Sequence, residues 1–180
     1  NARKLRDLTT LVAHQIGSEL SLNELANTLR INRATVERYL DLLEKCFILY
    51  RASSFSGNLR KEVTKTMRYY FVDTGIRNAV IGQFQPIEQR ADRGALWENY
   101  FVNERRRLHA YTHSGTQSYF WRTYDQQELD LIEVHPGGTL NAFECKWQNK
   151  KHRSPKAWQK AYPDTPVQFI HPQNYTEFLL

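Results

Sequence analysis

The sequence predicts a two-part α/β (α+β) chain, with a helical N-terminal part and a C-terminal part built on a central mixed sheet. Apolar residues at helical spacing dominate the first 45 residues. Two β-rich segments follow, and the rest of the chain then runs through the order αβββαβ. We expect one domain over residues 1–75, a second over residues 94–180, and a connector over residues 76–93.

Length and composition limit the class of protein. The chain has 180 residues, of which 41% are hydrophobic, so it can bury a core. It contains no run of about 18 apolar residues, as a membrane span needs, and its polar first residues lead us to expect no signal peptide. Two isolated cysteines fit a reducing compartment, so we expect a cytoplasmic protein without a membrane. Because the first residue is not methionine, we expect a fragment of a longer chain.

Charge is unevenly distributed along the chain, whose formal net charge is +6. Lysine and arginine outnumber acids 12 to 7 in residues 1–72, but only 13 to 12 in residues 73–180. A basic first part favours contact with an anion such as nucleic acid. A solvated basic face is the alternative.

The N-terminal part has the pattern of a helix-turn-helix. Helical spacing runs over residues 5–20, and Ser21 with Glu24 then forms a capping box. This box starts a short helix over residues 22–29, and a tight turn leads into a longer helix over residues 33–45. A short helix, a turn and a second helix are typical of DNA-binding modules.

Two predicted strands, at residues 47–51 and 67–72, complete this part as the wing of a winged helix. The residues expected at the DNA groove or at phosphates are Asn32, Arg33, Thr35, Arg38, Arg60, Lys61 and Lys65. The alternative is a winged helix that serves as a protein-docking or linker module, because acidic Glu37, Asp41 and Glu44 lie along the helix over residues 33–45.

The C-terminal part alternates helix and strand. The expected elements are a helix over 94–108, strands over 119–123, 128–134 and 140–147, a helix that begins at Ser154-Pro155, and a strand over 167–170. The turn at Pro136-Gly137-Gly138 makes the second and third strands a hairpin.

Four charged residues on these elements form a candidate catalytic and metal site. They are Glu98 on the helix, Asp130 on the second strand, and Glu144 and Lys146 on the third. Alternation puts Glu144 and Lys146 on one strand face, and the hairpin brings Asp130 beside them. Converging carboxylates need a cation, and oxygen ligands select Mg²⁺ or Mn²⁺. A metal and a lysine together can activate water and stabilise charge on a phosphodiester. Glu128 is a secondary ligand candidate.

Each of these features has a plainer interpretation. A single E-x-K on a strand usually marks a solvated face, and a single aspartate is often a turn residue. The agreement of three elements is what favours a site. Two basic runs, Arg105-Arg106-Arg107 and Lys150-Lys151-His152-Arg153, could hold phosphates, but for the arginines we favour a solvated helix end.

The C-terminal order and motif resemble the restriction-endonuclease-like, PD-(D/E)XK superfamily. The wider sequence resembles the C-terminal region of a prokaryotic family of AAA-type ATPases, in which a winged helix precedes a nuclease-like domain of unassigned function. The segments that carry this resemblance are YFVDTG at 70–75, GALWENYFV at 94–102, YFWRT at 119–123, ELD at 128–130 and FECK at 143–146.

The resemblance implies an N-terminal ATPase domain that is missing here. No G-x-x-x-x-G-K-[ST] loop occurs in these residues, so we expect no ATP site in this part. The family's active-site positions fall on Glu98, Asp130, Glu144 and Lys146. Rings are common among such ATPases and dimers among such nucleases, which leaves a homo-oligomer open.

Three hypotheses follow. The first is a metal-dependent DNA phosphodiesterase with a winged helix that delivers the substrate. The second is a non-catalytic scaffold that docks DNA or protein for the ATPase. The third is a winged-helix transcriptional regulator whose C-terminal domain is a sensor.

Overall fold

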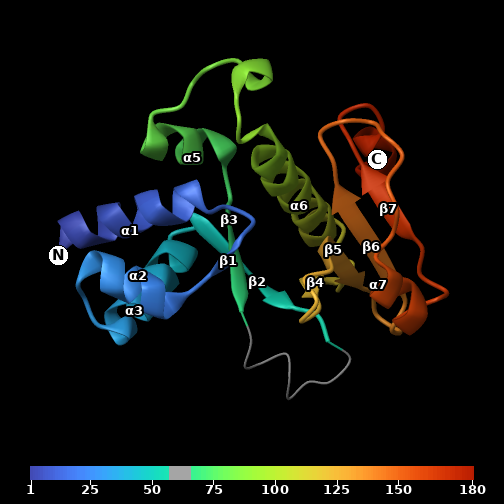
Figure 1. The fold of residues 1–180 in the computed structure, drawn as a ribbon, viewed down its shortest axis with the longest axis horizontal. Coiled ribbons are helices and arrows are strands. Elements are labelled where there is room, and N and C mark those ends of the chain that lie inside the picture. The colour runs from blue at the N-terminus through green and yellow to red at the C-terminus, as the bar shows by residue number, and fades with distance from the viewer. Residues whose placement is uncertain (57–65) are drawn as a thin grey trace. The chain divides into compact units, whose positions relative to one another are not determined.

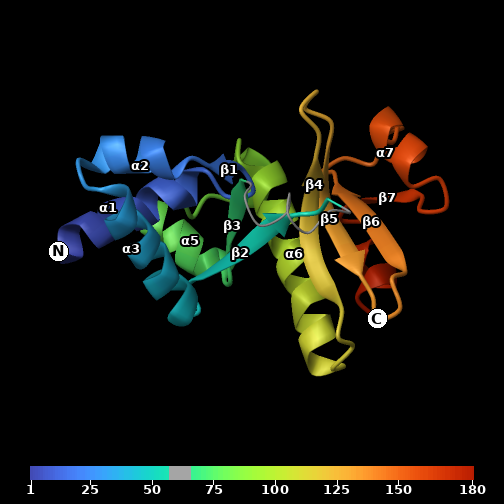
Figure 2. The same ribbon diagram turned by 90° about the horizontal axis from the view of Figure 1, so that it is seen from below.

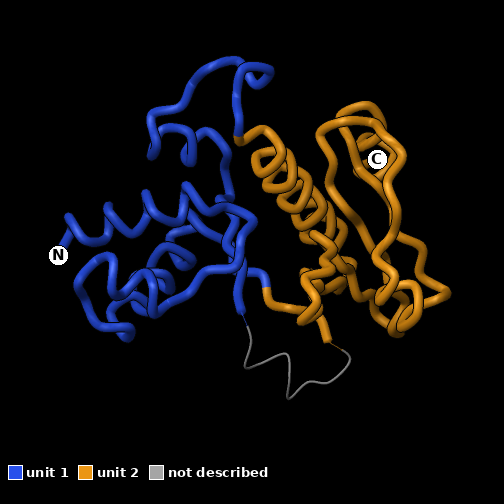
Figure 3. Tube along the Cα trace, viewed as in Figure 1, with its two compact units in different colours: residues 1–52, 66–91 blue, residues 53–65, 92–180 orange. Residues whose placement is uncertain are grey.

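The structure is a computed structural model that describes residues 1–56 and 66–180. Two units make up the chain: unit 1 contains residues 1–52 and 66–91, and unit 2 contains the described residues 53–56 and 92–180 (Figure 3). The strands follow the hydrogen-bonded order β1-β3-β2-β4-β5-β6-β7 in a mixed sheet. Strand β2 (Leu49–Ser54) contributes to both units because their boundary falls within it. The predicted mixed α/β class is confirmed.

Helices α1, α2 and α3 of unit 1 precede its strands β2 and β3, and helix α5 follows them (Figure 1). Its elements are α1 (Ala2–His14), β1 (Glu19–Leu20), α2 (Leu22–Leu29), α3 (Arg33–Lys45), the start of β2, β3 (Met67–Phe71), α5 (Thr74–Ile81) and the 3₁₀ turn η1 (Ile87–Gln89). The predicted cap of α2 is confirmed, because Ser21 Oγ accepts a hydrogen bond from Glu24 N at 3.3 Å. The apolar faces of the first three helices meet in a core that includes Leu8, Val12, Leu25, Leu29, Val36, Leu40 and Leu43.

The prediction of helix over residues 5–20 is wrong at its end. Helix α1 ends at His14, and Gly17, at φ +71°, donates to Tyr69 O at 3.3 Å. Glu19 then lies opposite Arg68 in an antiparallel ladder. The predicted pair of strands is therefore a three-stranded ladder, β1-β3-β2. A strand of two residues is too short to produce a detectable alternation of its own.

The segment predicted as a connector, residues 76–93, contains most of helix α5, which begins at Thr74. Asp73 caps this helix: its Oδ1 accepts from Ile76 N at 2.8 Å. Buried Arg77 then donates through Nε to Ala13 O at 2.8 Å, which ties α5 to α1. The Thr74-Gly75 pair concealed this helix because glycine is unfavourable in a helix.

Unit 2 follows the predicted element order. Its elements are α6 (Arg93–Tyr111), β4 (Gln117–Arg122), β5 (Glu128–Val134), β6 (Leu140–Cys145), α7 (Lys156–Ala161), β7 (Val167–Ile170) and the 3₁₀ turn η2 (Tyr175–Phe178). Strands β4, β5 and β6 are antiparallel, whereas β7 is parallel to β6. The end of β2 adds a parallel pairing with β4, which the sequence did not predict. Helix α7 begins at Lys156, with Pro155 in the N-cap position, so the predicted start at Ser154-Pro155 is too early.

Helices α6 and α7 cover opposite faces of these strands (Figure 2). Phe143 on β6 meets Phe101 of α6, with ring centroids 5.6 Å apart. The neighbouring residue Ala142 faces the other way, into a cluster around Trp158 of α7, because side chains alternate along a strand. A register shift between β4 and β5 lets Leu129 and Ile132, three residues apart, join that same cluster. Both faces of β5 and β6 are thus packed.

Among the described residues, no helix combines the length and the apolar character that crossing a membrane requires.

Candidate metal and catalytic site

The hairpin of β5 and β6 positions the candidate carboxylates. Its turn contains Gly137 at φ +95° and Gly138 at φ +88°, a conformation that other residues rarely adopt. In the resulting register Leu131 lies opposite Phe143, so Asp130 lies near the end of β6. Asp130 is 8% exposed, and its Oδ2 accepts a hydrogen bond from the Cys145 backbone N at 2.8 Å. The predicted proximity of Asp130 to the E-x-K segment is therefore present.

Glu144 and Lys146 contact each other directly. The two residues are separated by one position on an extended segment, so their side chains lie on the same side. Lys146 Nζ donates to Glu144 Oε1 at 2.6 Å, and the Glu144 side chain is only 12% exposed. The motif requires a carboxylate and a cation, and Glu144 and Lys146 supply them in direct contact.

The surroundings of Glu144 disfavour the charged form of its carboxyl group. Burial and the nearby charge of Asp130 raise its pKa from 4.5 to about 7, although Lys146 opposes the shift. Its Oε2 atom is buried and has no hydrogen-bond partner within the described part of the chain. A buried polar atom without a partner is destabilising, and strongly shifted pKa values are concentrated at functional sites.

Lys146 remains a cation at neutral pH. Burial lowers its pKa, but the hydrogen bond and charge of Glu144, together with the charge of Asp130, outweigh burial and hold the pKa above 10.5. A lysine in this state can donate hydrogen bonds and stabilise negative charge. It is a poor general base, because it is already protonated.

Glu98 lies on α6, half-buried. Its charge, with those of Asp130 and Glu144, adds to burial in raising the pKa of the Cys145 thiol, so it faces the same region. Within residues 1–56 and 66–180, however, no three histidine, cysteine, aspartate or glutamate side chains form a group that could hold a metal ion. The hydrogen bonds from Cys145 N to Asp130 and from Lys146 to Glu144 therefore do not by themselves make a three-ligand metal site among these described residues.

Replacing Glu144 with glutamine should stabilise metal-free unit 2 at pH 8, relative to the parent, by roughly 2 kcal/mol more than at pH 5. The raised pKa means that protonated Glu144 stabilises the fold below pH 4.5, and that this contribution is lost as the pH rises through about 7. Glutamine stays neutral throughout. Tryptophan fluorescence during urea unfolding in EDTA would measure the difference, because all four tryptophans lie in unit 2. An equal gap at both pH values would contradict the raised pKa.

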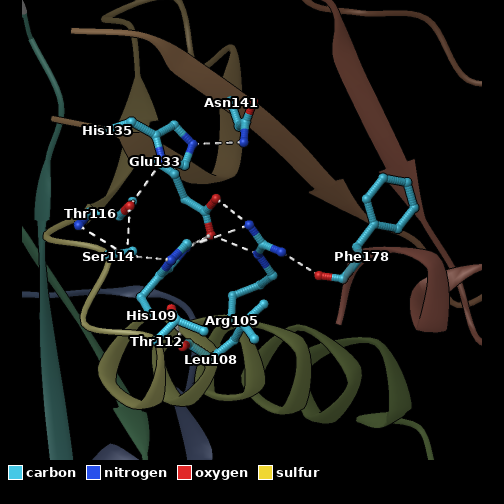
Figure 4. Close-up of polar contacts among 10 residues, drawn as sticks. All are labelled: Arg105, Leu108, His109, Thr112, Ser114, Thr116, Glu133, His135, Asn141 and Phe178. Carbon is cyan, nitrogen blue, oxygen red and sulfur yellow. Dashed lines mark hydrogen bonds and ion pairs between the residues drawn. The ribbon is translucent and has the colours of Figure 1, made fainter. Parts of the chain in front are cut away.

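A second polar cluster lies at the other end of β5 (Figure 4). Glu133 is fully buried and receives two hydrogen bonds from Arg105, at 2.8 and 2.6 Å, and one contact from His109 Nε2 at 2.8 Å. Burial raises the pKa of Glu133, but hydrogen bonds and charges from Arg105 and His109 outweigh burial and leave it below 4.5. Glu133 therefore contrasts with Glu144: it is the more deeply buried of the two, yet both of its carboxylate oxygens have partners.

The cluster continues as a chain of hydrogen bonds. His109 Nδ1 lies 2.9 Å from Ser114 Oγ, which lies 2.9 Å from Thr116 Oγ1. Thr116 Oγ1 lies 2.9 Å from His135 Nδ1, and His135 Nε2 lies 2.8 Å from Asn141 Nδ2. Ser114 Oγ donates to Thr116 Oγ1, and when Asn141 Nδ2 donates to His135 Nε2, neutral His135 donates from Nδ1 to the same Thr116 oxygen. Because Arg105 already neutralises Glu133, this cluster is better suited to joining α6, β5 and β6 than to catalysis.

This cluster corrects the prediction for the arginine run. Arg105 was expected at a solvated helix end, but it is only 8% exposed. It also donates to the Phe178 carbonyl oxygen and thereby holds the η2 segment. The spacing of Phe101, Arg105 and His109 along one helix face was the available signal, since that face is the one turned to the sheet.

Most predicted nucleic-acid contacts are exposed where the structure describes them. Arg33, Arg38, Lys150 and Lys151 are exposed. Arg33 Nε contacts Glu37 Oε1 at 2.9 Å, and Asn32 caps α3 by accepting from Thr35 N at 2.7 Å. The other predicted contacts, Arg60, Lys61 and Lys65, lie outside the described residues.

Comparison with known proteins gives two family matches. Residues 1–86 match a domain of unknown function (DUF8612), and residues 93–175 match another domain of unknown function (DUF4143). The junction between the matches falls at the boundary between units 1 and 2.

Relatives of the chain occur in bacteria and archaea. Uncharacterized proteins of Mycobacterium tuberculosis and Mycobacterium bovis are each 30% identical over 147 residues, which cover 81% of this chain and 32% of each relative. An uncharacterized protein of Methanocaldococcus jannaschii is 34% identical over 73 residues, covering 41% of this chain and 15% of that protein. The chain spans about a third of the length of the mycobacterial relatives. No solved structure matches it.

Proposed function

We propose that unit 2 is a Mg²⁺- or Mn²⁺-dependent DNA phosphodiesterase of the PD-(D/E)XK type. The observation that carries this proposal is Glu144, a buried carboxylate with a pKa of about 7 and an oxygen without a partner, beside Asp130 and Lys146. Glu133 on the adjacent strand has partners for its carboxylate and a lowered pKa. The raised pKa of Glu144 is therefore not a general consequence of placing a carboxylate in this sheet.

The donor set fits a hard divalent ion. Such ions are commonly held by one or two carboxylates, with water and substrate phosphate completing the coordination. Asp130 and Glu144 would hold the ion, and Glu98 would be a third ligand if its side chain came within coordinating distance of the ion. The ion, when bound, would polarise the phosphodiester and lower the pKa of a water molecule.

The remaining chemistry belongs to Lys146. As a partly exposed cation it would donate a hydrogen bond to the phosphate or to the attacking water and so stabilise charge that develops during attack. The Cys145 backbone N would keep Asp130 in place through its 2.8 Å hydrogen bond. Both groups act from one short segment, so their spacing is fixed by the backbone.

For the rest of the protein we propose a winged helix in unit 1, on the C-terminal side of an AAA-type ATPase domain. Helices α1 to α3 with the ladder β1-β3-β2 fit the winged-helix arrangement. The length of the mycobacterial relatives leaves room for such a domain. Unit 1 would position DNA, and the ATPase would power or gate the process.

Two observations favour a second candidate, the non-catalytic scaffold. The described residues form no three-ligand metal group, and Lys146 closes onto Glu144. In that case the carboxylates would serve the fold, and unit 2 would only dock DNA or protein.

Metal binding separates these two candidates. We expect calorimetry to show Mn²⁺ binding by the parent chain, its loss in both Asp130→Ala and Glu144→Ala, and its retention in Asp164→Ala, which removes an exposed carboxylate of the same unit. The titration is repeated with a DNA strand whose linkages resist hydrolysis, because phosphate can complete the coordination. No binding by the parent, with or without DNA, would overturn the phosphodiesterase and support the scaffold.

A further inference from the structure

The turn between β4 and β5 presents an exposed tyrosine. Tyr124 is 92% exposed. The turn around it is closed by hydrogen bonds from Thr123 N to Gln127 O at 2.9 Å and from Gln126 N to Thr123 O at 3.0 Å. Thr123 Oγ1 also accepts from Gln127 N at 3.2 Å. The ring is therefore displayed from an ordered turn, so binding there would require little further ordering of the backbone.

This turn is attached to the most basic segment of unit 2. Gln127 Oε1 accepts from Ala157 N at 3.0 Å, which joins the turn to the start of α7. No acid occurs in residues 145–163, and five exposed cations do: Lys150, Lys151, Arg153, Lys156 and Lys160. We call residues 150–160, which carry these five cations, the cationic segment. His152 lies within it and stacks on Phe169 with ring centroids 5.3 Å apart, which holds the segment against β7.

Both features lie at the candidate site's end of the sheet. Strand β5 begins at Glu128, directly after the turn, and Asp130 follows within about 7 Å along the strand. Strand β6 ends at Cys145, next to Asp130, and the chain then continues into the cationic segment. Figure 1 draws the β4–β5 turn and α7 at the same end of unit 2.

We propose that Tyr124 stacks on an unpaired base of a nucleic-acid strand whose phosphates lie along the cationic segment. This inference rests on the proposed function and narrows its substrate to single-stranded DNA, or to DNA with a single-stranded end. Bases of a duplex are stacked on one another, so an aromatic ring on a turn reaches a base face only where the strand is unpaired. Asp125, which is exposed beside Tyr124, repels phosphate. It therefore favours contact of the β4–β5 turn with a base rather than with the DNA backbone.

The test is fluorescence anisotropy of a labelled 20-nucleotide strand, alone and as a duplex, with the whole chain in EDTA so that no cleavage occurs. We expect Tyr124→Ala to weaken single-strand binding about 5- to 100-fold, the loss of one base–aromatic stack, and duplex binding by less than about twofold. Tyr124→Phe keeps the ring and should bind within about twofold of the parent. The control is Tyr111, the last residue of α6, which is 80% exposed. Tyr111→Ala should leave the binding of both DNA forms unchanged.

A second variant tests the phosphate contacts. The double change of Lys156 and Lys160 to alanine should weaken binding of both DNA forms and reduce the salt dependence by one to two phosphate contacts, roughly 0.7 in slope for each on single strands. Parent-like single-strand binding by Tyr124→Ala, or equal losses on strand and duplex, would overturn this inference and leave the phosphodiesterase standing. Absence of any DNA binding by the parent at low salt would overturn both.

Discussion

Strand cleavage should fall at least 100-fold when Lys146 is replaced with alanine, and Asp130→Ala should abolish it. Removing one preorganised donor to developing charge costs about 100- to 1,000-fold in rate, and removing a metal ligand costs the ion itself. The measurement is the cleavage rate of labelled DNA with saturating Mn²⁺. DNA affinity in EDTA should change little, because Asp130 is buried and Lys146 is one cation among many.

Lys146→Ala has two separable consequences. Lys146 lowers the pKa of Glu144, so its loss would leave Glu144 protonated over a wider pH range. If Lys146 acts only in this way, cleavage by the variant should recover towards the parent rate as the pH is raised to 9. If Lys146 also contacts the phosphate or the attacking water, the defect should persist at that pH. We expect it to persist, because the raised pKa of Lys146 keeps it a donor there in the parent chain.

Asp164→Ala is the matched control, since it removes a carboxylate that is exposed on the same unit. It should cleave like the parent. Parent-like cleavage by both Asp130→Ala and Lys146→Ala would place any activity elsewhere in the chain. A parent chain that binds DNA and metal but cuts no substrate would instead favour the scaffold.

Strands β5 and β7 were predicted at the bounds that the structure gives them. Strand β5 has turn residues on both sides, so its ends are marked in the sequence. The approach of Asp130 to the segment that carries Glu144 followed from the hairpin, because a short turn permits only one antiparallel partner. Local sequence was sufficient where an element and its neighbour along the chain pack against each other.

Contacts between distant segments were harder to predict. The pairing of β1 with β3 depends on residues about 50 positions apart, and the burial of Arg105 depends on Glu133. A charged residue on a helix is normally solvated, and only its partner's position reverses that expectation. The electrostatic difference between Glu133 and Glu144 was equally hidden, because both are acidic residues in apolar strands.

The largest expected effect on stability is that of Glu133→Ala, which should destabilise unit 2 by about 3–5 kcal/mol. The change removes the partner of Arg105, whose side chain is 10% exposed, and leaves its charge buried. It also removes the acceptor of His109 and so one end of the hydrogen-bond chain. Urea unfolding followed by tryptophan fluorescence reports on this loss within unit 2.

A double-mutant cycle distinguishes a lost ion pair from a lost side chain. Each single change, Arg105→Ala or Glu133→Ala, leaves the other residue's charge buried without its partner. If this unpaired charge is the main cause of the loss in stability, the double variant should lose much less stability than the sum of the two single variants. The exposed pair Arg33–Glu37, 2.9 Å apart, provides the comparison: Glu37→Ala should change the stability of unit 1 by no more than about 0.5 kcal/mol, measured by circular dichroism because unit 1 holds no tryptophan. A loss below about 1 kcal/mol in Glu133→Ala would mean that water reaches Arg105 once its partner is gone. The cluster would then owe its place to the packing of α6 on β5 and β6, and not to the ion pair.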